Sequence, residues 1–142
     1  MSFDPSKYTK KQTTGLTRYV AGEVYLVDDK CLTYPDQRAR KPHDTDRRVI
    51  VLQDESASAY EKLKTLLVAP CSASWGAGPF DFDFGETLPN GFTKSPTVFV
   101  SLVQPILKAD LRRREGTLLP EELDPLMALV AQLFGWASPL KI

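Results

Sequence analysis

The sequence is poor in the residues that build most metal and nucleotide sites. It has one histidine, His43, and two cysteines, Cys31 and Cys71, which lie far apart and form no CxxC motif. That set is too small for a zinc site of the usual Cys/His type. The phosphate-binding motifs GxGxxG and GxxxxGKS/T and the zinc-protease motif HExxH are also absent. We therefore expect no cofactor and no metal ion, and we set nucleotide-driven and zinc-protease chemistry aside.

A net charge of one sign and a long apolar run are missing too. Lysine plus arginine number 18, as do aspartate plus glutamate, so any nucleic-acid site must be a local patch. Apolar runs such as 65–70 are far shorter than the roughly 20 residues of a membrane span. The N-terminus lacks the basic start and apolar stretch of a secretory signal. We expect a cytoplasmic protein with no membrane partner and with reduced cysteines.

What is present fits one small domain. A chain of 142 residues can bury one core and is too short for two comfortable domains. Residues 1–20 are polar and show no sustained periodicity, which predicts a loosely ordered N-terminal arm. Residues 21–142 are predicted to form a single domain.

Most of that domain is predicted to be β-strand. Residues 49–52 are four consecutive branched apolar residues, typical of a strand buried on both faces. Residues 80–84 alternate Phe with Asp, so we interpret Asp81 and Asp83 as the wet face of a strand and not as a metal pair. Asn90-Gly91 is a strong hairpin signal. Strands are predicted at 22–28, 47–53, 65–69 (ended by Pro70), 80–84 and 97–102, with a last extended segment at 103–107.

Two connections separate the first three strands. Residues 29–46 are polar and highly charged, and a connection of that length is often functional. Residues 54–64 are predicted to be a loop or a short helix. After the third strand, residues 71–79 form a loop of mainly small residues that contains Trp75.

The C-terminal end is predicted to be helical. Five apolar residues recur at spacings of four and three, as on one face of a helix: Leu119, Leu123, Leu126, Val130 and Leu133. A proline breaks a helix interior, but Asp124-Pro125 also fits an N-cap followed by the first helical position. We therefore predict a short turn at 120–123 and a main helix from Pro125 to about Phe134, closed by Gly135. The whole pattern predicts a small barrel with this helix across one open end.

Several stretches of the sequence resemble the MazF/PemK toxins of bacterial toxin–antitoxin pairs. In the order of that family, they are 22–28 (GEVYLVD), 47–53 (RRVIVLQ), 67–72 (LVAPCS), 94–100 (KSPTVFV) through 108–111 (KADL), and 116–118 (GTL) with the terminal helix. Together they span about residues 22–136.

The resemblance implies a fold, an assembly and an activity. The fold would be mainly β, an SH3-like barrel of the MazF/CcdB type with a C-terminal α-helix. The assembly would be a homodimer with sites at the subunit interface, neutralised by an antitoxin with an acidic C-terminal segment. The activity would be metal-free cleavage of single-stranded RNA, in which the 2′-hydroxyl attacks the neighbouring phosphate. The protein must then take a proton, stabilise charge on the phosphorane and help the 5′-oxygen leave.

The family's catalytic arginine lies in the long first loop, just before the second strand. Aligned without gaps, Arg47 takes the place of the Arg in the family's Arg-Pro, Arg48 replaces the Pro, and the catalytic arginine falls on Asp44, beside His43. A gap in the loop would instead bring Arg40 into the catalytic position. His43 could also supply the acid/base function, because its ordinary pKa lies near 6.5. The third alternative is a decayed site that only binds.

On the third strand, Cys71 falls on the family's usual Thr and Ser72 on the usual Ser. We interpret Cys71 as a buried apolar residue and not as a nucleophile. Trp75 could stack on a base or cover the edge of the core, and the loop arginines could be an ordinary solvated charge cluster. The predicted catalytic residues are Arg40, Arg47, His43 and Ser72; the predicted RNA-binding residues are Arg38, Lys41, Arg48, Ser74 and Trp75.

Three functions are compatible with this pattern. The leading hypothesis is an endoribonuclease toxin neutralised by an antitoxin. The main alternative is a non-catalytic module of the same fold that binds RNA or protein. A topoisomerase poison is the third, since gyrase-inhibiting toxins share this barrel, and it rests on fold analogy alone.

Overall fold

A computed structural model of the chain describes residues 18–35, 46–72, 78–84, 89–92 and 96–136. Seven antiparallel strands form one sheet in the order β4-β5-β3-β2-β1-β7, with β6 also paired to β3. The strands are β1 (Glu23–Val27), β2 (Arg47–Val51), β3 (Thr65–Ser72), β4 (Asp81–Asp83), β5 (Thr97–Phe99), β6 (Gln104–Leu107) and β7 (Arg114–Thr117). The helices are α2 (Glu55–Ser58) and α3 (Pro120–Leu133), and the 3-10 turns are η1 (Asp29–Cys31), η2 (Val100–Leu102) and η3 (Lys108–Asp110).

The predicted mainly β class with a C-terminal helix is confirmed, but closure into a barrel is not. In the described part of the chain, β4 and β7 stand at opposite ends of the strand order and do not pair with each other. The sequence prediction also missed β7, because its residues Arg-Glu-Gly-Thr are polar and mostly exposed and carry no apolar alternation. The strand predicted at 97–102 ends at Phe99, where η2 begins.

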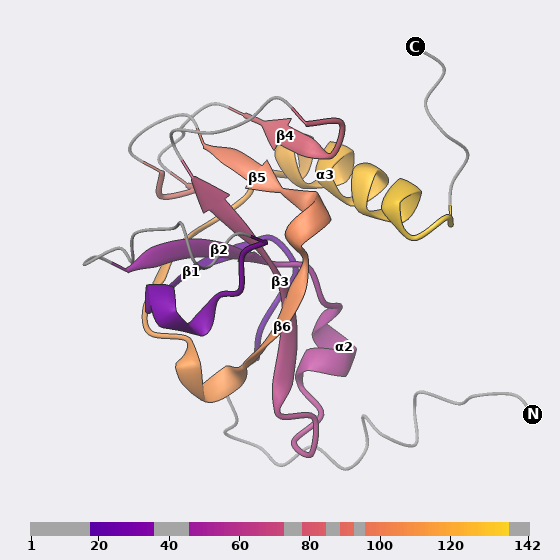
Figure 1. Ribbon diagram of the computed structural model, residues 1–142. Coiled ribbons are helices and arrows are strands. Elements are labelled where there is room, and N and C mark those ends of the chain that lie inside the picture. The colour runs from indigo at the N-terminus through magenta and orange to yellow at the C-terminus, as the bar shows by residue number, and fades with distance from the viewer. Residues whose placement is uncertain (1–17, 36–45, 73–77, 85–88, 93–95, 137–142) are drawn as a thin grey trace, which may run out of the picture.

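Strand β3 organises the sheet, running from the α2 end to the β4–β5 end of the molecule (Figure 1). On one side it pairs with β2; on the other it pairs first with β6, as far as Val68, and then with β5, from Cys71 onward. The prediction that Pro70 ends this strand is wrong. Pro70 lies where the partner on that side changes, so the ladder loses no hydrogen bond through the missing N–H.

The two faces of the sheet each bury an apolar core. The helix core, beneath α3, includes Val24, Ile50, Leu52, Ala69, Cys71, Phe92, Val98, Val100, Leu118, Leu126 and Val130. The strand core includes Tyr25, Val27, Leu32, Tyr34, Val49, Val51, Leu66, Val68 and Ile106. Because β2 contributes alternately to both cores, its predicted burial on both faces is confirmed.

Helix α3 packs on the helix core through Leu126 and Val130 and lies beside β4 and β5 (Figure 1). The predicted break at Pro125 is wrong, because the helix runs unbroken from Pro120. Pro125 is exposed, so water can serve the carbonyl that its missing N–H leaves without a partner. Gly135 closes the helix as predicted, with φ of 75° and its N–H on the Gln132 carbonyl at 3.0 Å.

The Asn90-Gly91 turn does not join two adjacent strand ends. Asp83 pairs with Thr97, so the β4–β5 connection is much longer than a two-residue hairpin. Of the two turn residues, only Gly91 has positive φ, at 75°, and a Cβ there would lie 2.3 Å from the Glu115 carbonyl oxygen. Glycine is therefore needed for close approach to β7. The predicted hairpin of 80–84 with 97–102 is confirmed, because β4 pairs with β5 and residues 89–91 form a turn within their connection.

Little of the N-terminal arm falls within the described residues. Tyr19 packs edge-on against Tyr25 with ring centroids 5.6 Å apart, and Arg18 lies 3.5 Å from Glu55. The division into an arm at 1–20 and a domain at 21–142 stays a prediction. The helices in the described segments include none whose length and apolar character would let it cross a membrane.

Candidate active site

Arg47 and Ser72 stand at the ends of two neighbouring strands, β2 and β3. The paired part of β2 and β3 ends at Val49 and Pro70, and a continuation of that register by two residues would put Arg47 opposite Ser72. Ser72 in turn pairs with Thr97 on β5, and Thr97 pairs with Asp83 on β4. Cross-strand partners share a face of the sheet, so these four polar residues form one line across four strands. We call this line the polar row: Arg47, Ser72, Thr97 and Asp83.

The continued register would give Arg47 and Ser72 the closer of the two kinds of antiparallel position. The Leu52 N–H donates to the Leu67 carbonyl at 3.0 Å, which makes that pair a hydrogen-bonded one. Hydrogen-bonded and non-hydrogen-bonded pairs alternate, so the position of Arg47 and Ser72, five residues along each strand, corresponds to a non-hydrogen-bonded pair. Side chains in such pairs lie nearest each other, with Cβ atoms about 4.5–5.5 Å apart.

A buried carboxylate holds Arg47. Its Nε donates to Asp29 Oδ1 at 2.9 Å, and the side chains of the two residues are 16% and 3% exposed. Asp29 opens η1, which is capped by Asp28 through a hydrogen bond from the Lys30 N–H at 2.9 Å. A charge-assisted contact of this kind fixes the plane of the guanidinium, and the two terminal nitrogens are not used in it.

At the other end of the polar row, Thr97 is buried and Asp83 is exposed. The Thr97 hydroxyl donates to Asp83 Oδ1 at 2.5 Å, which ties β4 to β5. Asp81, two residues earlier on the same face, accepts instead from the Gly78 N–H at 2.9 Å. The expectation that Asp83 faces solvent is confirmed, but this carboxylate also has a hydroxyl partner.

At the same register, the opposite face of these strands carries the core row: Arg48, Cys71, Val98 and Phe82. Cys71 pairs with Val98, and Val98 pairs with Phe82. Cys71 and Val98 belong to the helix core, and Phe82 packs against it. Burial raises the pKa of the Cys71 thiol, with nearby Arg48 opposing the shift. Cys71 is therefore a buried neutral thiol, as predicted, and not a nucleophile.

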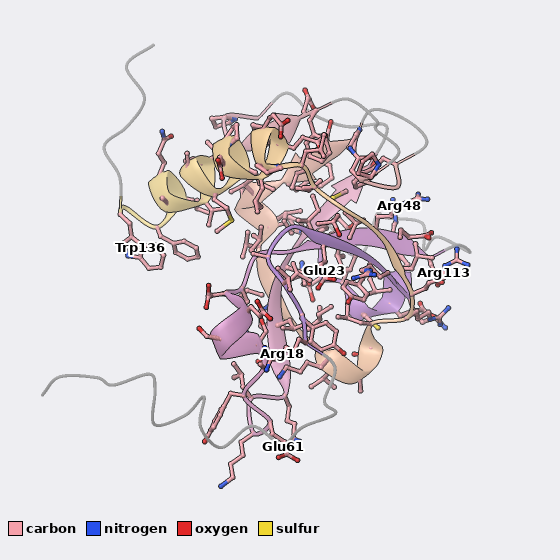
Figure 2. All side chains as sticks on the ribbon, turned by 180° about the vertical axis from the view of Figure 1, so that it is seen from behind. Arg18, Glu23, Arg48, Glu61, Arg113 and Trp136 are labelled. Carbon is pink, nitrogen blue, oxygen red and sulfur yellow. The ribbon has the colours of Figure 1, made fainter. Side chains whose placement is uncertain are left out.

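Arg48 covers the end of the helix core. Its guanidinium carbon lies 5.7 Å from the centroid of the Phe92 ring, and one terminal nitrogen lies 3.7 Å from Glu115. Its Nε is buried and has no hydrogen-bond partner within the described segments. Arg113 also pairs with Glu115, at 3.2 Å, and Figure 2 shows both arginines on the side of the molecule away from Trp136. Arg47 and Arg48 are thus neighbours in sequence that serve opposite faces.

Carboxylates pair with the arginines around this edge. Arg112 contacts Asp46 at 2.7 Å and Asp28 at 3.2 Å, the residues that precede Arg47 and Asp29. Arg114 lies 2.9 Å from buried Glu23. The Arg112 contacts are half exposed and individually weak. The described residues therefore form a balanced network around Arg47 and no broad basic surface.

Comparisons with known proteins were made by sequence and by structure. No protein-family model matches the sequence, and no curated protein matches it. Solved structures do match. The Mycobacterium tuberculosis toxin MazF-mt6 covers 82% of this chain and 99% of its own, at 19% identity and a TM-score of 0.61. A mycobacterial endoribonuclease in complex with its cognate antitoxin covers 85% and 99%, at 12% identity and a TM-score of 0.62.

A MazE–MazF structure from Deinococcus radiodurans covers 86% of this chain and 100% of its own, at 13% identity and a TM-score of 0.64. The chain has the MazF fold. At these identities the likeness establishes the MazF fold alone, and it confirms the resemblance on which the fold was predicted. What the chain does must be argued from its own residues.

The structure describes only part of the predicted site on this MazF fold. Arg47, Arg48 and Ser72 are described; the continued register puts Arg47 and Ser72 on one face of the sheet and Arg48 on the other. The remaining predicted residues lie outside the described segments: Arg38, Arg40, Lys41, His43, Ser74 and Trp75. No three His, Cys, Asp or Glu side chains within the described segments are arranged to hold a metal ion.

Sequence reasoning missed three residues of this region. Asp29 is the second of two aspartates that follow the first strand. Nothing in the sequence indicates that it bonds Arg47, which lies eighteen residues further along the chain. Thr97 and Asp83 carry a weak signal, because each stands at the polar end of a predicted strand of one hairpin. Their pairing could have been proposed only with the register of β3, β4 and β5 in hand.

Proposed function

We propose that this chain is a toxin-type endoribonuclease that cleaves single-stranded RNA without a metal ion, through attack of a 2′-hydroxyl on the adjacent phosphate. The observation that supports the proposal is the β2–β3 register, whose continuation beyond Val49 and Pro70 would set Arg47 opposite Ser72 at the ends of the two strands. It would bring an oriented cation and a hydroxyl together on a MazF fold.

In this mechanism Arg47 stabilises the phosphorane. Its guanidinium is held through Nε by Asp29, so the terminal nitrogens can meet two phosphate oxygens without reorganising. A neutralising partner that is buried and already hydrogen-bonded orients the group before the substrate arrives. Asp29 is therefore proposed as the residue that positions the arginine.

Ser72 is proposed to assist beside Arg47, within reach of the same phosphate or its 2′-hydroxyl. His43 is proposed as the acid/base group, because an imidazole with an ordinary pKa near 6.5 can both take and return a proton. Arg40 remains the alternative phosphate-stabilising arginine. Five further residues are proposed to bind the RNA strand: Arg38, Lys41, Arg48, Ser74 and Trp75.

The proposed partners follow the proposed activity. A nuclease of cellular RNA would act in the cytoplasm and must be restrained, and one structural neighbour is an endoribonuclease in complex with its cognate antitoxin. We therefore include an antitoxin with an acidic C-terminal segment among the partners. The assembly is proposed to be a homodimer, as a closed two-fold pair would cover exposed apolar strand residues such as Leu67 and Leu107.

The test is incubation of the full chain with mixed-sequence RNA in EDTA. We expect cleavage with a 2′,3′-cyclic phosphate end, about 10²–10³-fold slower in Arg47→Ala, and slower in Ser72→Ala. Arg40→Ala tests the alternative arginine, and Arg18→Ala is the control, because Arg18 pairs with Glu55 far from this edge (Figure 2). Cleavage that survives the Arg40, Arg47 and Ser72 changes would contradict the site. Binding without cleavage would favour the non-catalytic module, and a requirement for Mg²⁺ would contradict the mechanism.

A further inference from the structure

Glu115 joins two arginines at the end of the helix core, on the face of the sheet opposite Arg47. Its Oε1 lies 3.7 Å from a terminal nitrogen of Arg48 and 3.3 Å from one of Arg113. Arg48 is the cross-strand partner of Leu26, whose N–H donates to the Arg113 carbonyl at 2.9 Å. The two arginines therefore lie on either side of β1, at one edge of the molecule (Figure 2). We call Arg48, Arg113 and Glu115 the two-arginine cluster.

A β-bulge brings Glu115 to this face. The register between β1 and β7 shifts between Val24 and Tyr25, so Glu115 is an extra residue of β7. In an unbroken register Glu115 would lie opposite Tyr25 and would share its side of the sheet, which is the strand core. The bulge leaves the carboxylate beside Arg48 instead. Bulges of this kind re-aim a side chain and are common next to functional sites.

The two-arginine cluster carries one unbalanced positive charge, because two guanidiniums share a single carboxylate. The neighbouring arginines are placed differently. Arg114 contacts a carboxylate of its own, Glu23, at 2.9 Å. Arg112 contacts two carboxylates, Asp28 and Asp46. A backbone phosphate of a nucleic acid carries one negative charge and would balance the cluster.

Arg48 is held in place with donors to spare. Its guanidinium lies over Phe92, and its Nε is buried without a hydrogen-bond partner in the described part of the chain. The contact of 3.7 Å with Glu115 is too long for a hydrogen bond. Burying a donor without a partner costs free energy, so packing on Phe92 alone does not account for an arginine here. The Arg113 side chain is 74% exposed. A guanidinium fork matches two phosphate oxygens, so the terminal nitrogens of this pair suit a phosphate.

We propose that the two-arginine cluster binds one backbone phosphate of the RNA, at a nucleotide that flanks the cleavage position. The inference rests on the proposed function, which puts the cleaved phosphate at Arg47. Arg47 and Arg48 are consecutive residues on opposite faces, so a single strand that passes over the start of β2 reaches both. RNA is favoured over an acidic peptide because the same strand already passes Arg47. The cluster contributes to binding, and Arg47 acts on the reacting phosphate.

The experiment measures the Kd of the full chain for a labelled, mixed-sequence, single-stranded RNA with 2′-O-methyl groups, which cannot be cleaved. Fluorescence anisotropy is recorded over a range of salt concentrations. Arg113→Gln should weaken binding about fivefold at low salt. It should also reduce the slope of log Kd against log salt by about 0.7, the effect of one phosphate contact on a single strand. Arg113→Lys should retain the slope, because lysine keeps the charge. Arg18→Ala is the control, since it removes an exposed charge that pairs with Glu55 elsewhere.

Coupling between the two arginines is the second test. Arg48→Gln should lose the same part of the slope as Arg113→Gln, and the double variant should lose little more, because one phosphate is shared. A slope like the parent's in Arg113→Gln would overturn the proposal, and so would slope losses that add in the double variant. An Arg113→Gln variant that binds a labelled polyglutamate peptide less tightly, but RNA equally well, would overturn it in favour of an acidic protein partner. If Arg48→Gln does not fold, the exposed Arg113 variants still decide.

Cleavage of unmodified RNA separates failure of this inference from failure of the proposed function. Arg113→Gln should raise KM about fivefold with kcat unchanged, because the cluster does not contact the reacting atoms. A parent chain that cleaves RNA, with the same Kd in Arg113→Gln, contradicts the inference alone. A parent chain that cleaves no RNA, but binds the 2′-O-methyl RNA through Arg113, contradicts the proposed function and supports the phosphate site.

Discussion

The polar row and the core row cross the same four strands at the same register and differ by one residue on each strand. The polar row holds a guanidinium, two hydroxyls and a carboxylate, whereas the core row holds Arg48 and the apolar-face residues Cys71, Val98 and Phe82. Each adjacent pair in the sequence is therefore divided between two environments. Arg47 contacts buried Asp29, and Arg48 covers Phe92.

This difference shows how a small sheet builds a site without losing its core. Successive side chains on a strand point to opposite faces, so at this end of the sheet one face can carry polar residues while the other continues the helix core. Helix α3 closes the packed face through Leu126 and Val130. The polar row is thereby presented on strands that are held from behind, which is the kind of support that a preorganised site needs.

The largest effect should come from substituting Arg47 and Arg48, one at a time, and comparing the variants. Arg47→Ala should cleave RNA about 10²–10³-fold more slowly, and Arg47→Lys should recover little, because lysine lacks the planar fork. Arg48→Ala should act mainly on KM and on stability, through lost packing on Phe92. Steady-state cleavage rates and urea unfolding of the three variants check this. A larger fall in kcat for Arg48→Ala than for Arg47→Ala would reverse the assignment of the faces.

A smaller effect separates Cys71 from Ser72. Cys71→Ser places a hydroxyl in the helix core and should lower the free energy of unfolding by about 1–3 kcal/mol, with kcat unchanged. Ser72→Ala should do the opposite, lowering kcat while the unfolding free energy stays within about 0.5 kcal/mol. Urea denaturation followed by fluorescence, beside the cleavage assay, measures both quantities. A stable Cys71→Ser variant with lowered kcat would mean that the core row reaches the substrate.

The smallest effect concerns the two thiols. Burial raises the pKa of the Cys71 thiol, so the folded state favours its neutral form. That stabilisation is fully present below the ordinary pKa of about 8.5 and is lost as pH rises further, so the unfolding free energy should fall above that pH. Cys71→Ala should flatten the decline.

Alkylation with iodoacetamide at pH 8, read by mass spectrometry, gives a second measure of the same property. Cys31 is half-buried, and its pKa is raised by burial and by the charges of Asp110 and Asp28, so it should react slowly. Cys71 should react only after unfolding. Labelling of Cys71 before Cys31 would show that this end of the helix core opens readily.

Much of the fold could be predicted from the sequence, because apolar periodicity is a local property. The run 49–52, the alternation at 80–84 and the C-terminal stripe each identified an element that the structure contains. The failures were also physical. The sequence pattern predicts breaks at Pro70 and Pro125, but each lies where its missing N–H costs little. Strand β7 is polar and gave no periodic signal.

The site was less predictable, because it depends on register. Arg47 and Ser72 were chosen by resemblance to a family, and nothing in the sequence separated Arg47 from Arg48 until β2 showed which core each one faces. Asp29, Thr97 and Asp83 entered only through contacts between distant segments. A carboxylate that bonds an arginine from a distant segment cannot be recognised from the residues next to it in the sequence.

The most direct test is a crystal structure of the chain with RNA that carries a 2′-O-methyl group at the cleaved nucleotide, which blocks the attack. The account predicts that the phosphate following the modified sugar lies within about 4 Å of the Arg47 terminal nitrogens. Asp29 should remain on Arg47 Nε, and Ser72 should face the modified oxygen. A phosphate bound instead by Arg48 above Phe92, with Arg47 and Ser72 away from the RNA, would contradict the central claim.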